Sequence, residues 1–234
     1  MELNKKVAIV TGVSKGIGEA LCKALLSEGC MVYGLGINAP PIQDQNLQFI
    51  PTDIRSFAAV ESAIQTIVKQ EQHVHILINN AGLGYFANVE DLPLEQWDQM
   101  FQTNINGMFY TCKLIVPIMK QQGIGHIVNI SSTAGLEGMP MVSGYCATKW
   151  AVKGFSESLW RELRDHKIKV TCVYPGSVKT DFFRNSPGIQ AHDFMLMPSD
   201  VAELILQALK APDNCHQVNL EIRPLQPKGP KTKQ

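Results

Sequence analysis

A buried strand, a glycine-rich turn and a helix follow one another directly in residues 7–28, and this succession constrains the fold most. Residues 7–10 (VAIV) are all apolar and mostly β-branched, which is typical of a strand buried on both faces. The turn 11–18 (TGVSKGIG) leads into apolar residues at helical spacing, Ile17, Leu21 and Leu25. Glycines in such a turn let the backbone approach a pyrophosphate closely, and the helix N-terminus attracts the anion. The segment therefore predicts a dinucleotide-binding β–α unit.

The same alternation of strand and helix continues along the chain. Apolar runs predict further strands at 31–37, 47–52, 75–79, 125–131, 168–174 and 218–223. Helical patterns occupy 56–71, 94–121, 143–166 and 198–210, whereas the link between the second and third strands is too short for a good helix. We therefore predict an α/β fold with one doubly wound parallel sheet of the Rossmann type, about seven strands in a single domain over residues 1–225. We expect 182–197 to be a mobile loop and the Lys/Pro-rich tail 226–234 to be disordered.

Composition argues against several classes of protein. Lys and Arg together number 21, as do Asp and Glu, so no basic surplus favours nucleic acid or an anionic membrane. No apolar stretch approaches the roughly 18 residues of a transmembrane helix, and the apolar run after Lys6 is too short for a signal peptide. The six cysteines are scattered without a C-x-x-C pair, which favours reduced thiols in the cytoplasm. His73 and His75 alone are too few for a metal site, so we expect no metal.

The residue types best suited to catalysis are Ser132, Tyr145 and Lys149. Tyr145 and Lys149 are four apart, so on a helix they share a face one turn apart. A phenol has a pKa of about 10, and bringing it to about 7 takes roughly 4 kcal/mol of stabilisation of the phenolate. An ammonium about 4 Å away supplies roughly that at an effective dielectric of about 20. We therefore expect Lys149 to lower the pKa of Tyr145, and the Ser132 hydroxyl to hold a substrate oxygen beside it.

With these residues placed, the chain resembles the short-chain dehydrogenase/reductase family in its compact single-domain branch. The resemblance extends from Thr11 to about Pro224 and includes TGxxxGxG at 11–18, NNAG at 79–82, the Ser/Tyr/Lys set, and Pro175-Gly176 followed by Val178 and Thr180. It implies that Tyr145 is the general acid or base, that Lys149 lowers its pKa and holds the nicotinamide ribose, and that Ser132 orients the substrate oxygen. Asn104 matches the family's catalytic Asn and is expected to anchor a water that links Lys149 to solvent.

The resemblance also implies a set of cofactor contacts. The glycine turn should meet the pyrophosphate and ribose through Gly12, Ser14, Gly16, Ile17 and Gly18. Asp53 would accept from the adenine amine, with Ile54 beside the ring; the alternative is that Asp53 is simply an acid near the helix start at Ser56. The remaining contacts would come from the ends of later strands, through Asn80, Ala81, Gly82, Pro175, Gly176, Val178 and Thr180. All of these follow strands, at the carboxyl edge where open α/β sheets bind ligands.

The end of the second predicted strand favours NADP(H) over NAD(H). An NAD enzyme usually has a carboxylate there, but this chain has Gly36, Ile37 and Asn38. Lys15 is placed to pair with a 2′-phosphate, although it is also readable as a solvated loop lysine. No Arg follows the second strand, so we predict one cation at most in this pocket and modest discrimination, with NAD(H) as the alternative.

The predicted loops around the nicotinamide are apolar. They carry Leu83, Tyr85, Phe86, Met139, Phe182, Phe183 and Met195, which favour a small neutral carbonyl or alcohol substrate. The shortened second crossover and the ending at 219–224 (NLEIRP) argue against a fatty-acid-synthesis ketoreductase. Helix 94–121 is apolar nearly all round in its later half, so part of it should bury against a partner chain in a homodimer or homotetramer.

Three other functions fit the same fold. A catalytically silent NAD(P)-binding sensor would be expected to lose the Tyr or the Lys, and both are present. An NAD-dependent alcohol dehydrogenase would use the same residues with the other cofactor. A sugar-nucleotide epimerase is disfavoured by the glycine spacing and the short C-terminal region.

Overall fold

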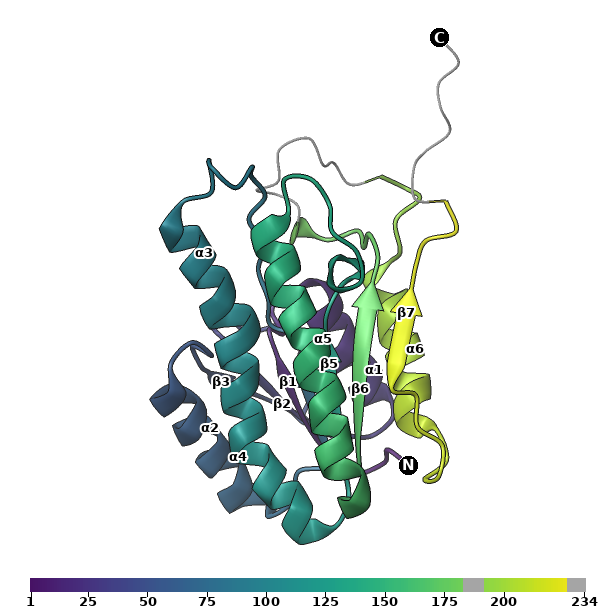
Figure 1. Ribbon diagram of the computed structural model, residues 1–234. Coiled ribbons are helices and arrows are strands. Elements are labelled where there is room, and N and C mark those ends of the chain that lie inside the picture. Colours follow the sequence, from purple (N-terminus) through teal and green to yellow (C-terminus); the bar gives the residue numbers. More distant parts are fainter. Residues whose placement is uncertain (183–191, 227–234) are drawn as a thin grey trace.

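A seven-stranded parallel sheet forms the centre of the molecule, seen here in a computed structural model that describes residues 1–182 and 192–226 (Figure 1). Its strands stand in the order β3-β2-β1-β4-β5-β6-β7, and every neighbouring pair is parallel. Their bounds are β1 Val7–Thr11, β2 Met31–Gly36, β3 Leu47–Pro51, β4 Ile76–Asn79, β5 Gly125–Ile130, β6 Ile168–Pro175 and β7 Asn219–Ile222. The predicted α/β fold with one doubly wound sheet is confirmed.

Helices cover both faces of the sheet (Figure 1). One face carries α2 Phe57–Glu71, α4 Gly107–Gln122 and α5 Ser143–Leu163, and the other carries α1 Gly16–Ser27 and α6 Pro198–Lys210. Alternate residues of β1 serve the two layers: Val7 and Ile9 join the α2/α4/α5 core, whereas Ala8 and Val10 join the α1/α6 core. Burial on both faces explains why these strands are continuous apolar runs in the sequence.

Two predictions about the connections had different outcomes. The link 37–46 between β2 and β3 contains no helix, as predicted. The single helix predicted at 94–121 is wrong in its middle, because α3 Leu94–Phe101 joins α4 through a π-helical turn, Gln102–Asn106. In that turn the Gly107 N–H donates to the Gln102 carbonyl, five residues back.

The predicted mobile loop and disordered tail fall largely on residues 183–191 and 227–234, which lie outside the described residues. Leu196, in the described part of the predicted loop, forms main-chain hydrogen bonds with the segment that follows β6. Leu196 accepts from the Lys179 N–H at 2.8 Å and donates its own N–H to the Ser177 carbonyl at 3.0 Å. Within the described parts of the chain, no helix is both long and apolar enough to cross a membrane.

The order of the sheet reverses direction between β1 and β4, and the residues after these strands are tied together there. The Asn80 side chain donates to the Thr11 carbonyl at 3.0 Å and to the Gly12 carbonyl at 2.9 Å. The Thr11 hydroxyl in turn accepts from the N–H groups of Asn80 and Ala81, each at 3.0 Å. A reversal of this kind leaves a crevice at the carboxyl ends of the strands, which is where such sheets bind ligands.

Candidate active site

A cavity of about 580 Å³ opens at this reversal and collects residues that follow β1 to β6. It brings together almost all the residues predicted from sequence to bind a cofactor or catalyse. Those that line it are Gly12, Ser14, Lys15, Gly16, Ile17, Asp53, Ile54, Asn80, Ala81, Gly82, Ser132, Tyr145, Lys149, Pro175, Gly176, Val178 and Thr180. Two predicted residues, Gly18 and Asn104, lie behind its walls.

The turn after β1 can be built only with glycine at two of its positions. Gly12 has a φ of +71°, and a Cβ on it would lie 2.7 Å from the Ala81 Cα. A Cβ on Gly18 would lie 2.1 Å from the Gly12 carbonyl oxygen. Gly18 therefore serves the close packing of the turn on the first turn of α1, and is not itself part of the cavity surface.

The first turn of α1 offers main-chain donors to the cavity. The residue before the helix, Lys15, makes no side-chain capping bond, and the first N–H groups of a helix have no partner within it. Gly16 and Ile17 belong to this turn and line the cavity. Free N–H groups and the positive end of the helix suit a pyrophosphate, and the cavity continues to the loops after β3, β4 and β6, so the residues present fit a dinucleotide.

Ser131 and Ser132 have different tasks. The Ser131 hydroxyl is buried and donates to the main-chain carbonyl of Lys149 at 2.9 Å. Ser132 caps the short turn Thr133–Gly135 by accepting from the Ala134 N–H at 3.2 Å, and its hydroxyl adjoins the Tyr145 phenol. The alternation of side chains after β5 thus directs Ser132, as predicted, and not Ser131, to the tyrosine.

Tyr145 stands in the first turn of α5 and is enclosed by aromatic rings. Its ring centre lies 5.6 Å from that of Phe86 and 5.5 Å from that of Phe182. Burial among these rings raises the pKa of the Tyr145 phenol, and hydrogen bonding to the Ser132 hydroxyl offsets this only in part. Burial therefore sets the net direction of this shift, and the expectation that Lys149 lowers the pKa of Tyr145 stays a prediction.

Lys149 lies one turn further along α5 and is also buried. Its Nζ is 5.6 Å from the Tyr145 ring centre and donates to the Ile130 carbonyl at 2.9 Å. Burial lowers the pKa of Lys149 to about 8, since the charged form loses hydration. No carboxylate among the described residues forms an ion pair with it.

Asn104 lies in the π-helical turn, where its side chain makes three hydrogen bonds. Its Oδ1 accepts from the Leu83 N–H, and its Nδ2 donates to the Leu83 carbonyl, both at 2.9 Å. The same Nδ2 donates to the Thr148 hydroxyl at 3.0 Å. The Asn104 side chain therefore ties the loop after β4 to α5 next to Lys149, and its link to a water stays a prediction.

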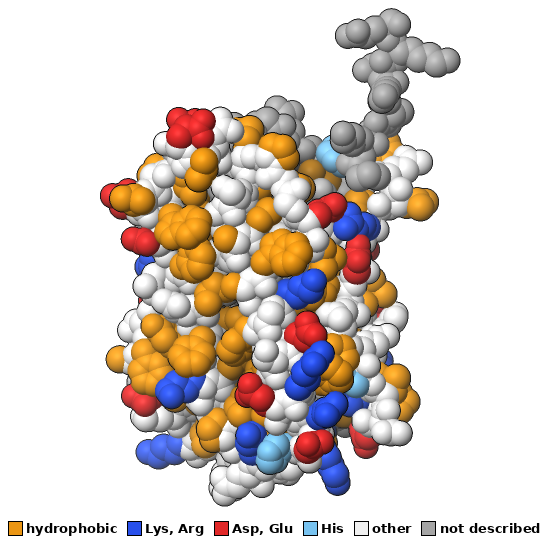
Figure 2. All heavy atoms as spheres, viewed as in Figure 1, with side chains coloured by type: hydrophobic (Ala, Val, Ile, Leu, Met, Phe, Trp, Pro, Cys, Tyr) orange, Lys and Arg blue, Asp and Glu red, His pale blue; other side chains and the backbone are white. Residues whose placement is uncertain are grey.

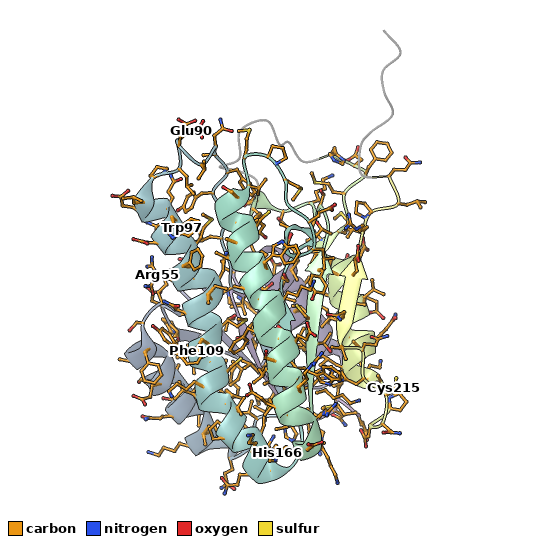
Figure 3. All side chains as sticks on the ribbon, viewed as in Figure 1. Arg55, Glu90, Trp97, Phe109, His166 and Cys215 are labelled. Atoms are coloured by element: carbon orange, nitrogen blue, oxygen red, sulfur yellow. The ribbon has the colours of Figure 1, made fainter. Side chains whose placement is uncertain are left out.

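The sequence analysis missed one residue that lines the cavity. Arg55 lines it together with Lys15, whereas one cation at most was predicted for the pocket after the second strand. Arg55 forms a two-pronged pair with Asp53, with Nε 2.9 Å from Oδ1 and a terminal nitrogen 2.7 Å from Oδ2. It projects at the edge of the molecule just before α2 (Figure 3). The Asp53 carboxylate predicted to meet adenine is thus already engaged by arginine.

The apolar wall near Tyr145 contains most of the predicted residues. Leu83, Phe86, Met139 and Phe182 line the cavity, and Val142 joins them. Tyr85 is turned to Gln99, to which its hydroxyl donates at 2.7 Å, and neither Tyr85 nor Met195 lines the cavity. Phe183 lies outside the described residues. Among those described, no group of three or more His, Cys, Asp or Glu side chains could hold a metal ion.

Comparison with known proteins gives consistent matches along the chain. A family model described as short chain dehydrogenase matches residues 6–188. An uncharacterised oxidoreductase of Staphylococcus haemolyticus is 34% identical over 235 residues, covering 96% of this chain and 99% of that protein. An alcohol dehydrogenase from the archaeon Thermococcus sibiricus, solved with 5-hydroxy-NADP, is 27% identical with a TM-score of 0.87, covering 97% of this chain and 100% of the other. The 3-ketoacyl-(acyl-carrier-protein) reductase of Brucella melitensis, solved with NADH, is also 27% identical, with a TM-score of 0.86 and the same coverage.

Proposed function

The chain belongs to the short-chain dehydrogenase family and is an oxidoreductase, and from this premise we propose that it transfers hydride between NADP(H) and a small neutral carbonyl or alcohol compound. The observation that carries the proposal is the convergence of Ser132, Tyr145 and Lys149 at one cavity with a free helix N-terminus. A sensor without catalysis would need only the nucleotide-binding part of this arrangement.

The side chains supply proton transfer and orientation, whereas the nicotinamide supplies or accepts the hydride. Ser132 is placed to hold the substrate oxygen, and Tyr145 to give a proton to that oxygen as its negative charge develops. The raised pKa of the Tyr145 phenol keeps it protonated near neutral pH. A protonated phenol is the form that reduction of a carbonyl requires, and the phenolate is the form that oxidation of an alcohol requires.

Lys149 is suited to replace the proton that Tyr145 gives up. With its pKa lowered to about 8, it is still mainly protonated near neutral pH, yet releases a proton more readily than an exposed lysine. Its positive charge beside the ring also favours the phenolate left after transfer. We propose that Asn104 holds a water on the path from Lys149 to solvent.

The adenosine end supports NADP(H) as the preferred cofactor. Gly36, Ile37 and Asn38 line the cavity after β2 and bring no carboxylate that would repel a 2′-phosphate. Lys15 also lines it, with a side chain that is 61% exposed. Solved relatives are described with an NADP derivative in one case and NADH in another, so the choice rests on this chain's own residues.

The substrate class is proposed from the wall around Tyr145. Leu83, Phe86, Met139, Val142 and Phe182 present apolar surface and no charged group. Such a wall favours a neutral, mainly apolar ketone or aldehyde over a charged keto acid.

We also propose a homodimer or homotetramer. Trp97 of α3, Phe109 of α4 and Trp150 of α5 are each more than a third exposed. Hydrophobic side chains gather over these helices in Figure 2, and Figure 3 labels Trp97 and Phe109 among them. A face of this kind is typical of a surface that a second copy covers. A monomer mass in light scattering, or a Phe109→Asp variant with the wild-type mass, would contradict the proposed assembly.

All six cysteines are free and five are buried, which supports a reducing compartment such as the cytoplasm.

The main test is a screen of purified protein with NADPH or NADH against neutral aldehydes and ketones and matched charged keto acids. We expect turnover of neutral compounds, with the higher kcat/KM for NADPH, and weaker NADPH binding in Lys15→Ala. No turnover of any compound despite cofactor binding would favour the sensor. Tighter NADH binding in the wild type would favour the NAD-dependent alternative.

A further inference from the structure

Lys15 is held across the cofactor cavity by a carboxylate from a distant part of the chain. Its Nζ lies 3.2 Å from Oδ2 of Asp181, and both residues line the cavity. Asp181 follows Thr180, in the segment after β6 that the glycine turn directly approaches. A Cβ placed on Gly16 would lie 3.2 Å from the Thr180 Cγ2. The ion pair therefore joins the glycine turn after β1 to the segment after β6, two walls of the proposed cofactor cavity.

We infer that Asp181 sets the strength of cofactor selectivity by competing with the 2′-phosphate of NADP(H) for Lys15. The inference rests on the proposed pairing of Lys15 with that phosphate. A lysine ammonium is a single point charge, and it cannot give its full attraction to a carboxylate and a phosphate at once. A carboxylate left near the phosphate also repels it. Asp181 thus weakens binding of NADP(H) more than binding of NAD(H), which carries no such phosphate.

The other cation at this end of the cavity is less available for exchange. Arg55 makes three contacts of 2.7 to 3.2 Å between its side chain and the Asp53 carboxylate. Lys15 makes one contact with Asp181, and both side chains are more than 60% exposed. A bidentate arginine pair is the stronger and geometrically more specific of the two arrangements. Lys15 is accordingly the cation that an arriving phosphate draws away from its partner.

The test compares Asp181→Asn with wild type by titrating NADPH and NADH into each protein and following nicotinamide fluorescence. The control is Asp193→Asn, because Asp193 also forms an exposed pair with a lysine of this region, Lys179 at 2.9 Å, but does not line the cavity. We expect the NADPH dissociation constant of Asp181→Asn to fall about threefold to fivefold, the range an exposed ion pair supports, with NADH changed less than twofold. The difference in NADPH affinity between Asp181→Asn and wild type should become smaller as the salt concentration rises.

The ratio of the NADH to the NADPH dissociation constant is compared between variants, because a general effect on the fold would change both constants and leave their ratio unaltered. Equal tightening of both cofactors, no change in the ratio, or the same change in Asp193→Asn would overturn the inference. A Lys15→Ala/Asp181→Asn double variant adds a second criterion. When Lys15 is absent, Asp181→Asn should increase the ratio of the NADH to the NADPH dissociation constant by less than half as much as it does when Lys15 is present.

These outcomes separate the inference from the proposal on which it rests. If Lys15→Ala leaves NADPH affinity unchanged, the proposed cofactor pairing itself is wrong. If Lys15→Ala weakens NADPH binding but Asp181→Asn does not strengthen it, only the competition by Asp181 is wrong.

Discussion

The Lys149 Nζ lies 5.6 Å from the Tyr145 ring centre and donates a hydrogen bond to the Ile130 carbonyl instead of the phenol. The two side chains share one face of α5, and both are buried. Burial therefore acts on each in its own direction: it raises the pKa of the tyrosine and lowers that of the lysine. Near neutral pH the phenol is therefore neutral, whereas Lys149, with a pKa of about 8, still carries its charge for most of the time.

Tyr145→Phe should separate binding from chemistry. The ring and its contacts with Phe86 and Phe182 are kept, whereas the proton donor is lost. We expect kcat to fall about 10²- to 10⁴-fold, the range for loss of a general acid, and cofactor affinity to stay within about twofold. Tyr85→Phe is the matched control, because that hydroxyl binds Gln99 outside the cavity. A Tyr145→Phe enzyme that kept most of its kcat would show that another group donates the proton.

The two adjacent serines should differ in their effect on activity. Ser132→Ala removes the hydroxyl beside the phenol, so kcat should fall about 10²-fold, and loss of its bond from the Ala134 N–H should lower the free energy of unfolding by about 1 kcal/mol. Ser131→Ala removes a buried hydrogen bond to the Lys149 carbonyl, and the free energy of unfolding should drop by about 1 kcal/mol. Steady-state kinetics and urea unfolding of both variants measure this. Loss of activity in Ser131→Ala alone would mean that the roles are reversed.

The sequence predicts those site residues whose position is set by the order of the strands and helices alone. Ser132 and Asn80 follow strands, and parallel strands bring their carboxyl ends to one edge, so the order of the elements was enough. Arg55 and Asp181 were missed because the direction of a long or exposed side chain depends on partners distant along the chain or specific to the local turn. The π-helical turn was missed because Asn104 is fixed by Leu83 and Thr148, contacts that no local pattern reveals.

The buried Lys149 ammonium should lower the free energy of unfolding at neutral pH. Burial lowers its pKa to about 8 from the usual value near 10.5, so below about pH 8 the folded protein carries a proton that it binds less tightly than the unfolded chain does. Stability from this group therefore rises as pH increases from about 8 to 10.5. We expect Lys149→Met to raise the free energy of unfolding by about 2 to 3 kcal/mol at pH 7 and to abolish turnover.

Lys153→Met is the control for that measurement. Lys153 lies on the same helix, only partly buried, with its Nζ 4.9 Å from the Trp150 ring centre. Its replacement should change the free energy of unfolding by less than about 0.5 kcal/mol. Urea unfolding at pH 7 and pH 9 compares the variants with wild type. A Lys149→Met protein that is less stable than wild type at pH 7 would mean that the Ile130 hydrogen bond outweighs the desolvation of the ammonium.

His126 should make the protein sensitive to acid at the opposite end of the sheet. It is 1% exposed, its Nε2 lies 2.8 Å from the Thr171 hydroxyl, and its Nδ1 has no partner in the described structure. Burial lowers the pKa of His126 to about 3, and the nearby His216 acts in the same direction. Below its usual pKa of about 6.5 the unfolded chain binds a proton that the folded protein does not, so stability is lost as pH falls from about 6.5 towards 3.

The size of this loss can be isolated with His126→Leu. Removal of the ring eliminates the titration, and the Thr171 hydroxyl keeps its bond to the Gln217 carbonyl at 2.7 Å. Between pH 7 and pH 4 we expect wild type to lose about 3 kcal/mol more free energy of unfolding than the variant, since each proton of difference contributes about 1.4 kcal/mol per pH unit. His75 and His216, whose pKa values burial also lowers, are present in both proteins, so the difference between the two slopes reports the loss of the His126 ring and its effect on the neighbouring His216 ring. Urea unfolding at several pH values measures the two slopes, and parallel slopes would show that His126 accepts a proton in the folded state.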